Sequence, residues 1–261
     1  MEVMLPTAVG GAAALFGAVT YGLLQPAGRR GGSRGGRWLS PPQSDRIDLA
    51  AFAPADLSAG LARASSPAFR MAKRFFDIML ASLLLLASAP LLAVVAILVP
   101  LESAGPVFYR QERVGAGGRV FRIVKFRSMR QDAEAGGARW AAVNDDRVTR
   151  IGRLIRHFRI DEIPQAFNVL AGDMSFVGPR PERPEFVGLL REAIPHYDLR
   201  HSVKPGITGW AQVKHQYGAS IEDAVEKHRF DLFYLKNNGP LMDLGIVLLT
   251  VRVALFGLGA R

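Results

Sequence analysis

Cysteine is absent from this chain of 261 residues, so the sequence can form neither a disulfide framework nor a thiolate metal site. Its five histidines show no spacing typical of a zinc site. The common phosphate-binding signatures are missing as well, because there is no P-loop, no G-x-G-x-x-G motif and no D-x-D motif. If the protein handles phosphate, another arrangement of residues has to bind it.

Acidic residues are in the minority. Lys and Arg number 33 against 23 Asp and Glu, which gives a formal net charge of +10, and hydrophobic residues make up 49% of the chain. A chain that is both basic and apolar suggests nucleic acid or an anionic membrane surface as its partner. The length allows one or two domains.

The N-terminal part of the chain contains an apolar stretch at residues 3–24, which is long enough to span a bilayer. If it inserts, the positive charges that follow it leave the rest of the chain cytoplasmic by the positive-inside rule. Its glycines also allow an interfacial or disordered segment. We therefore expect a possible membrane segment at 1–25, a flexible Gly/Arg-rich linker at 26–70 and the main domain at 71–261.

A second apolar stretch, residues 78–101, carries no charge and would extend roughly 36 Å as a straight helix. Pro90 lies in its middle and deprives the carbonyl four residues earlier of its partner, which Ser88 could replace. Basic flanks on both sides favour a broken helix that enters and leaves the same leaflet, within about residues 73–101. A spanning helix with a tolerated proline is the alternative.

The centre of the chain predicts a helix, a turn, a second helix and a stiff loop. Thr149 is a typical N-cap for the first helix, and Pro164 and Gly172 suit the start and the end of the second. This places Asp161 and Glu162 at a helix N-terminus, where carboxylates stay ionised and phosphate binds readily. The ordinary alternative is a pair of capping acids beside a solvated arginine face.

Arginines surround this acid pair in the sequence. They are Arg150, Arg153, Arg156, Arg159, Arg180 and Arg183. Prolines on both sides of Arg180 fix its backbone, which reduces the entropy lost when its planar guanidinium binds an anion. An acid pair among fixed cations is one way to handle phosphate.

Short strands are expected at 105–115 and 120–129, joined by a glycine turn. Further along, Ser220 begins a capping box that opens a helix containing Asp231. Taken alone, Lys125 is a surface lysine on a strand edge and Asp231 is an exposed helical acid.

Several segments together resemble the bacterial sugar transferases, the monotopic polyprenyl-phosphate phosphoglycosyl transferases. They read PVFYRQERVG, KFRSM, RIDEIPQAFNVLAGDMSFVGPRP and KPGITGWAQV, and the resemblance runs from about residue 73 to about 255. Two positions depart from the family pattern. Lys204 stands where the family has arginine, which keeps the charge but loses the planar fork. Ala89 stands where the family usually has serine directly before the proline.

The resemblance implies an α/β fold that is mainly helical with a small sheet. It also implies a membrane-associated re-entrant hairpin that bends at Ser88 and Pro90, together with interfacial helices. Asp161 would be the nucleophile, and Glu162 would hold Mg²⁺. The residues expected to bind phosphate or nucleotide are Lys125, Arg156, Arg180, Lys204 and Asp231.

The implied activity is transfer of a sugar 1-phosphate from a UDP-sugar to a polyprenyl phosphate such as undecaprenyl phosphate. UMP would be released, through a covalent aspartyl-phosphosugar intermediate. This would be the first membrane step of exopolysaccharide, capsule or other cell-surface glycan synthesis, at the cytoplasmic face of a bacterial inner membrane. The sequence does not identify the sugar.

Two other functions stay open. One is a catalytically inactive membrane scaffold of a glycan assembly complex, and the other is a membrane-tethered nucleic-acid binder. Because the acid pair would repel a nucleic-acid backbone, we expect no nucleic-acid partner. Glycines in the N-terminal segment would allow helices to pack in a homo-oligomer.

Overall fold

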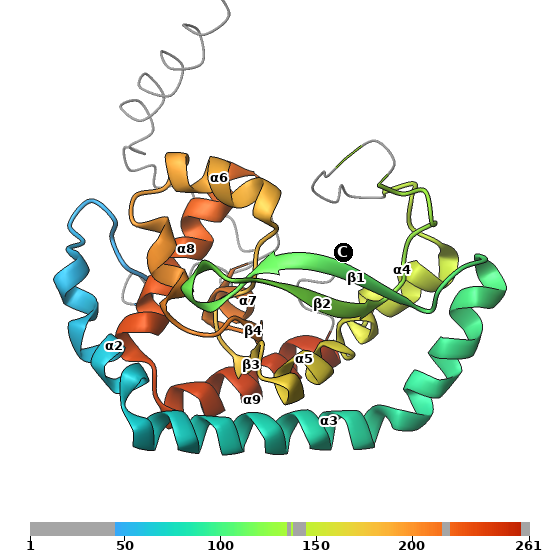
Figure 1. Ribbon diagram of the computed structural model, residues 1–261, viewed down its shortest axis with the longest axis horizontal. Coiled ribbons are helices and arrows are strands. Elements are labelled where there is room, and N and C mark those ends of the chain that lie inside the picture. Colours follow the sequence, from blue (N-terminus) through green and yellow to red (C-terminus); the bar gives the residue numbers. More distant parts are fainter. Residues whose placement is uncertain (1–44, 135–136, 138–144, 216–219, 257–261) are drawn as a thin grey trace, which may run out of the picture. The chain divides into compact units, whose positions relative to one another are not determined.

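The elements run from a long helix near the N-terminus through a β-hairpin to a set of shorter helices (Figure 1). The structure, a computed structural model, describes residues 45–134, 137, 145–215 and 220–256. By its contacts the chain divides after Ser40, and all described residues belong to the compact unit that follows. The membrane segment predicted at 1–25 lies outside the described residues.

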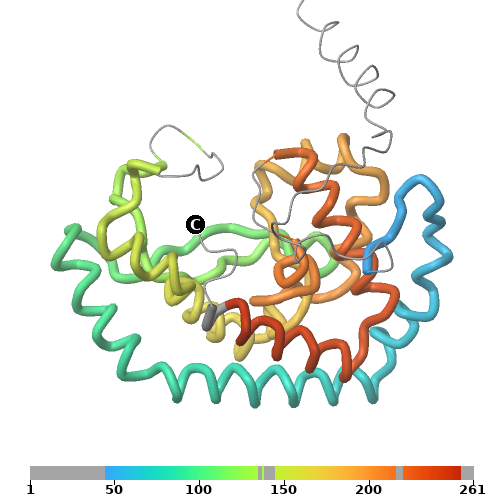
Figure 2. The backbone as a smooth tube through the Cα atoms, turned by 180° about the vertical axis from the view of Figure 1, so that it is seen from behind, coloured from blue at the N-terminus to red at the C-terminus, as the bar shows by residue number. Residues whose placement is uncertain are grey.

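Helix α3 (Pro67–Glu102) contains Pro90 and yet is one helix, which bends along its length (Figures 1 and 2). Pro90 deprives the Leu86 carbonyl of its amide partner. The Ser88 hydroxyl donates to the Leu84 carbonyl instead, at 2.6 Å. Ser88 therefore does not repair the break in the way the sequence predicts, although a serine bonded to the carbonyl four residues earlier itself favours a bend.

The apolar surface of α3 is largely uncovered. Among the described residues α3 is the one helix long and apolar enough to cross a membrane, and 11% of its most apolar 18-residue window is buried. The core helix of a soluble domain would be mostly buried, so the exposure of α3 favours contact with lipid.

A β-hairpin forms one wall of the later site. Strand β1 (Phe108–Val114) pairs antiparallel with β2 (Val120–Phe126), as predicted. The connecting 3-10 turn η3 (Ala116–Gly118) contains Gly117 and Gly118 at φ of 64° and 77°, a conformation that glycine adopts without strain. Phe121 and Ile123 of β2 are buried in one cluster with residues of α3 and α5, and Phe126 is buried in another with residues of α3 and α4.

The acid-pair segment is built from α4 (Arg150–His157), the 3-10 turn η4 (Ile160–Glu162) and α5 (Gln165–Ala171). The Thr149 hydroxyl caps α4 by accepting from the Gly152 amide at 2.9 Å, which confirms the predicted N-cap. The acid pair lies in η4, just before α5, rather than in the first turn of the second helix as the sequence predicts.

A second, parallel pair of strands anchors the stiff loop. Strands β3 (Ser175–Val177) and β4 (Gly206–Thr208) pair so closely that a Cβ on Gly206 would lie 2.1 Å from the Gly178 amide nitrogen. The Gly206 amide also donates to the Pro179 carbonyl at 2.9 Å. The connections contain helix α6 (Pro184–Ala193), the 3-10 helix η5 (Tyr197–Ser202) and, after β4, helix α7 (Trp210–Lys214).

Of the last two helices, α8 packs against the first described elements, and α9 packs against α7, β3 and β4. The elements are η2 (Pro54–Leu57), α2 (Ser58–Ser65), α8 (Ile221–Asn237) and α9 (Pro240–Phe256). Leu57 is fully buried with Leu232 and Leu235 of α8. Within the stretch predicted as a linker, residues 54–65 form η2 and α2, and Leu57 and Leu61 pack against α8.

The expected mainly helical fold with little sheet is confirmed within the described residues. The sheet consists of two separate two-stranded pieces, β1–β2 and β3–β4.

Candidate active site

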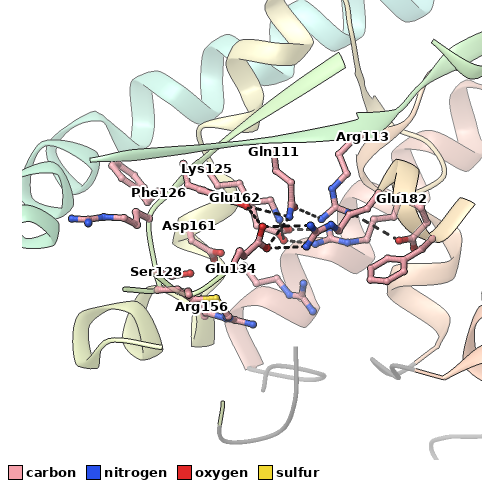
Figure 3. Close-up of a pocket in the computed structure, with 18 of the residues that line it drawn as sticks. Gln111, Arg113, Lys125, Phe126, Ser128, Glu134, Arg156, Asp161, Glu162 and Glu182 are labelled. Carbon is pink, nitrogen blue, oxygen red and sulfur yellow. Dashed lines mark hydrogen bonds and ion pairs between the residues drawn. The ribbon is translucent and has the colours of Figure 1, made fainter. Parts of the chain in front are cut away.

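A pocket of about 400 Å³ is lined by residues of the hairpin, η4, the loop after β3, η5, α7 and α8. Figure 3 shows Asp161, Glu162, Lys125 and Arg156 on one side of it. Helix α4, which precedes η4, packs closely on the segment after β2, because a Cβ on Gly152 would lie 1.9 Å from the Ser128 carbonyl.

Both carboxylate oxygens of Glu162 are bound by cations. Lys125 Nζ donates to Oε1 at 3.2 Å, and Arg180 donates to Oε2 at 3.0 Å and also to Oε1. Burial alone would raise the pKa of Glu162, but the charges of Arg180 and Lys125 outweigh it and hold this pKa well below its usual range. Glu162 is thus a fixed anion at working pH.

Asp161, the neighbour of Glu162, is 9% exposed. Burial and, second, the charge of Glu162 raise its pKa to about 6, although Lys125, Arg156 and Arg180 pull it down. A carboxylate whose ionised form is disfavoured in this way is still mostly ionised at pH 7, and it is more basic than an ordinary aspartate. Both properties suit a nucleophile.

Two guanidinium groups hold the loop that carries Arg180. Arg200 donates to the Arg180 carbonyl at 2.7 Å, and Arg113 donates to the Pro181 carbonyl at 2.9 Å. Each is a charge-assisted hydrogen bond to backbone, so the loop is fixed from both sides. The side chain of Arg180 thereby points at the acid pair with little freedom.

Asp231, on α8, supports one of these two arginines. Its carboxylate lies 2.9 Å from Arg200, which also donates to the Tyr197 hydroxyl at 2.6 Å. Asp231 is 1% exposed, and burial raises its pKa to about 6 against the opposing charge of Arg200. It lines the same pocket as Asp161.

Glu134 is the centre of a further polar cluster in the pocket lining. It accepts hydrogen bonds from the Tyr109 hydroxyl at 2.9 Å and from Arg183 at 2.8 Å, and Gln111 lies 3.4 Å away. This cluster joins β1 to the segment that follows the stiff loop.

Comparison with known proteins agrees with this geometry. A family model described as "Bacterial sugar transferase" matches residues 68–257. The chain belongs to this family.

Three curated relatives show how the match is distributed. An Aeromonas hydrophila protein, "UDP-N-acetylgalactosamine-undecaprenyl-phosphate N-acetylgalactosaminephosphotransferase", is 50% identical over 196 residues, which are 75% of this chain and 46% of that protein. A Caulobacter vibrioides "UDP-glucose:undecaprenyl-phosphate glucose-1-phosphate transferase" is 39% identical over 82% of this chain and 84% of its own length. "Exopolysaccharide production protein PSS" of Rhizobium leguminosarum is 40% identical over 69% of this chain and 92% of its own length. The chain thus spans less than half of the Aeromonas protein and most of the other two.

The structure brings most of the predicted site residues of this sugar transferase together. The pocket lining contains Asp161, Glu162, Lys125, Arg156, Arg180 and Asp231. Lys204 is not among the lining residues. It lies at the end of α5, beside Gly172 and Arg74, so its placement gives no support to the predicted nucleotide contact. Ser88 and Pro90 lie within α3.

Several lining residues were not singled out from the sequence. They are Gln111, Arg113, Glu134, Arg200 and Lys227. Gln111 and Arg113 are defined positions of the motif in the PVFYRQERVG segment, so the motif could have identified them. Glu134 belongs to no motif, and nothing in the local sequence relates it to Tyr109 or Arg183.

The residues fit Mg²⁺ in one specific way. The described part of the chain contains no cluster of three potential protein ligands. Mg²⁺ in phosphoryl-transfer sites is commonly held by only one or two carboxylates, with substrate phosphates and water completing its shell. Glu162 is the carboxylate that fits this part, and in this structure its two oxygens accept from Lys125 and Arg180.

Proposed function

We propose that this sugar transferase moves a sugar 1-phosphate from a UDP-sugar to a polyprenyl phosphate, such as undecaprenyl phosphate, and releases UMP. The observation that carries the proposal is a pair of adjacent carboxylates, Asp161 and Glu162, which line one pocket together with Lys125, Arg156 and Arg180. Glu162 is ionised and clamped by Lys125 and Arg180, whereas Asp161 is buried with its pKa raised to about 6.

In the proposed mechanism an Asp161 oxygen attacks the phosphorus that bears the sugar. The bond from this phosphorus to the UMP oxygen breaks, and UMP leaves with the bonding electrons. A phosphate oxygen of the polyprenyl phosphate then attacks the same phosphorus and releases the Asp161 carboxylate. Covalent catalysis of this kind divides one difficult displacement into two easier ones.

Cations in the pocket would stabilise the charge that develops on the phosphoryl oxygens. Lys125, Arg156 and Arg180 all act electrostatically on Asp161, so a phosphoryl group bound to that carboxylate would lie within their field. The two backbone bonds from Arg113 and Arg200 keep the Arg180 loop fixed, which lowers the reorganisation needed in the transition state. Glu162 would hold Mg²⁺ together with the diphosphate, and the bound ion would neutralise negative charge on the substrate.

The membrane part of the proposal depends on α3. Its exposed apolar surface would lie in the bilayer, where the long polyprenyl chain is dissolved. Basic flanks at both ends favour a re-entrant helix whose two ends share the cytoplasmic face, bent near Ser88 and Pro90. The site would then work at the membrane surface, at the first membrane step of a cell-surface glycan.

The test is release of UMP by the detergent-solubilised full chain with Mg²⁺ and undecaprenyl phosphate. The donor panel should include UDP-N-acetylgalactosamine and UDP-glucose, the sugars in the names of the relatives, besides other UDP-sugars. Release with one donor and its loss in Asp161→Asn would support the reaction and the nucleophile. Absence of release with every donor would favour an inactive scaffold.

A further inference from the structure

A cluster of three cations lies outside the pocket, where the N-terminal part of α3 meets the end of α5. Gly172 ends α5 at φ 91° and has no side chain. A Cβ at this position would lie 3.7 Å from Lys204 Nζ and 3.9 Å from an Arg74 guanidinium nitrogen. Two cations from distant parts of the sequence thus face the same small space. Arg70, one helical turn before Arg74, adds to the positive potential at Lys204.

Capping of α5 accounts for only one of these cations. Arg74 donates to the carbonyls of Val169 and Leu170 at 2.6 and 2.7 Å, and so satisfies the C-terminal end of α5. Lys204 Nζ has no such carbonyl partner among the hydrogen bonds of the described residues. Burial and, next, the charge of Arg74 lower the pKa of Lys204, with a smaller contribution from Arg70.

The two acids that act electrostatically on Lys204, Asp77 and Asp173, already interact with other groups. Asp77 accepts from the Ser175 hydroxyl and the Phe176 amide, both at 2.8 Å. Asp173 lies 3.2 Å from Arg119. A bound anion would therefore relieve the repulsion between Lys204 and the two arginines.

The surroundings of the cluster indicate where this anion comes from. Met71 and Phe75 of α3, which follow Arg70 and Arg74 directly, are 72% and 71% exposed. An exposed apolar face beside basic side chains is the arrangement by which proteins contact the phosphate level of an anionic bilayer.

We propose that Arg70, Arg74 and Lys204 form a second phosphate site, separate from the pocket, which binds the phosphate of an anionic lipid at the membrane surface. The phosphate can belong to a bulk phospholipid or to a polyprenyl phosphate waiting near the site, since both present the same anionic group. The site assigns a role to Lys204 that the pocket does not give it. It does not depend on the transfer reaction.

The test is native mass spectrometry of the full chain in detergent, titrated separately with phosphatidylglycerol, phosphatidylcholine and undecaprenyl phosphate. We expect wild-type protein to retain the anionic lipids in preference to phosphatidylcholine. Lys204→Gln and Arg70→Gln should each weaken anionic-lipid binding about fivefold, the equivalent of about 1 kcal/mol per basic residue near an anionic surface. Lys204→Arg should restore binding. Lys236→Gln removes the same charge from an exposed lysine of α8 and should leave binding unchanged.

Competition distinguishes the two lipid sources. If undecaprenyl phosphate displaces phosphatidylglycerol at substoichiometric amounts, the acceptor lipid occupies the site. If the two lipids exchange equally, the site recognises the phosphate group alone. Equal retention of phosphatidylcholine and phosphatidylglycerol by the wild type would overturn the proposal. The proposal would also be overturned if Lys204→Gln and Arg70→Gln both bound anionic lipid as well as the wild type does. It would be overturned too if inorganic phosphate displaced the bound lipid as effectively as another lipid does.

Discussion

Asp161 and Glu162 are neighbours in one 3-10 turn, yet their carboxyl groups are shifted in opposite directions. Glu162 faces Arg180 and Lys125 directly, whereas Asp161 is buried beside the charge of Glu162. The same cations act electrostatically on both carboxylates, and hydrogen bonds from Arg180 and Lys125 reach Glu162. Two carboxylates in one pocket with separated pKa values are typical of sites that assign them different chemical tasks.

Asp161→Asn should abolish the release of UMP while the protein remains folded. The wild-type aspartate has its pKa raised to about 6, so its ionised form is less favourable in the folded chain than in the unfolded one at pH 7. A neutral amide of the same shape removes that cost. We therefore expect the variant to unfold at the same or a higher temperature, measured by differential scanning fluorimetry in detergent. A clear fall in the unfolding temperature would show that Asp161 is needed for the fold and would undermine its assignment as a nucleophile.

The rate of the first half-reaction should fall in acid. Attack needs ionised Asp161, so kcat/KM for UMP release should be constant above about pH 7 and should drop tenfold per pH unit below about 6. A burst of UMP measured without polyprenyl phosphate removes the titration of the acceptor from the profile. Asp231 has a pKa of similar value, so Asp231→Asn is the control and should keep the acid limb. If Asp231→Asn no longer showed the fall of the rate in acid, that fall would be due to titration of Asp231 and not of Asp161.

Local sequence predicts the secondary structure of the site well and its packing poorly. The periodic apolar residues of α4 and the Thr149 cap identify the helix correctly. They do not show what covers it, since Ile155 is 2% exposed and Leu154 is 57% exposed on the same predicted face. Helical periodicity identifies the apolar face of a helix. Elements far away in the sequence decide whether protein or lipid covers that face.

Long-range contacts explain which site residues the sequence could reveal. Asp161, Glu162 and Arg180 lie within one short motif, so their proximity is readable. Arg200 and Asp231 meet only because η5 packs on α8, and no local pattern contains that information. Lys204 is the opposite case. Its place in a motif predicted a contact with the nucleotide, whereas the parallel pairing of β3 and β4 places it beside Arg74.

Arg200→Lys should lower kcat/KM for the UDP-sugar, because the loop that carries Arg180 loses part of its support. The guanidinium of Arg200 serves Asp231, the Tyr197 hydroxyl and the Arg180 carbonyl together, and a lysine cannot serve all three. Loss of one charge-assisted hydrogen bond costs about 1.5–3 kcal/mol, so kcat/KM for the UDP-sugar should fall at least about tenfold. Arg113→Lys should act in the same direction through the Pro181 carbonyl. Arg110→Lys, on the exposed side of β1, is the matched control, and an equal effect there would contradict a positioning role.

The two ends of α3 should be accessible from the same side of the membrane. Since the chain has no cysteine, single cysteines can be introduced without a background. Ala68→Cys and Ala104→Cys place exposed thiols just inside the start and just beyond the end of α3. A membrane-impermeant maleimide should label both in inverted inner-membrane vesicles and neither in intact spheroplasts. Labelling of one position from each side would show that α3 spans the bilayer.

Leu57→Ala should destabilise the catalytic unit although Leu57 lies far from the pocket. Its side chain is fully buried with Leu232 and Leu235 of α8, the helix that also carries Asp231. Truncating a fully buried leucine costs about 2–5 kcal/mol, through lost transfer energy and the cavity that remains. Leu189→Ala removes the same atoms from a position that is 47% exposed and should change the free energy of unfolding much less. Urea titration in detergent, followed by tryptophan fluorescence, compares the two variants. Equal midpoints would mean that the packing of Leu57 does not stabilise α8.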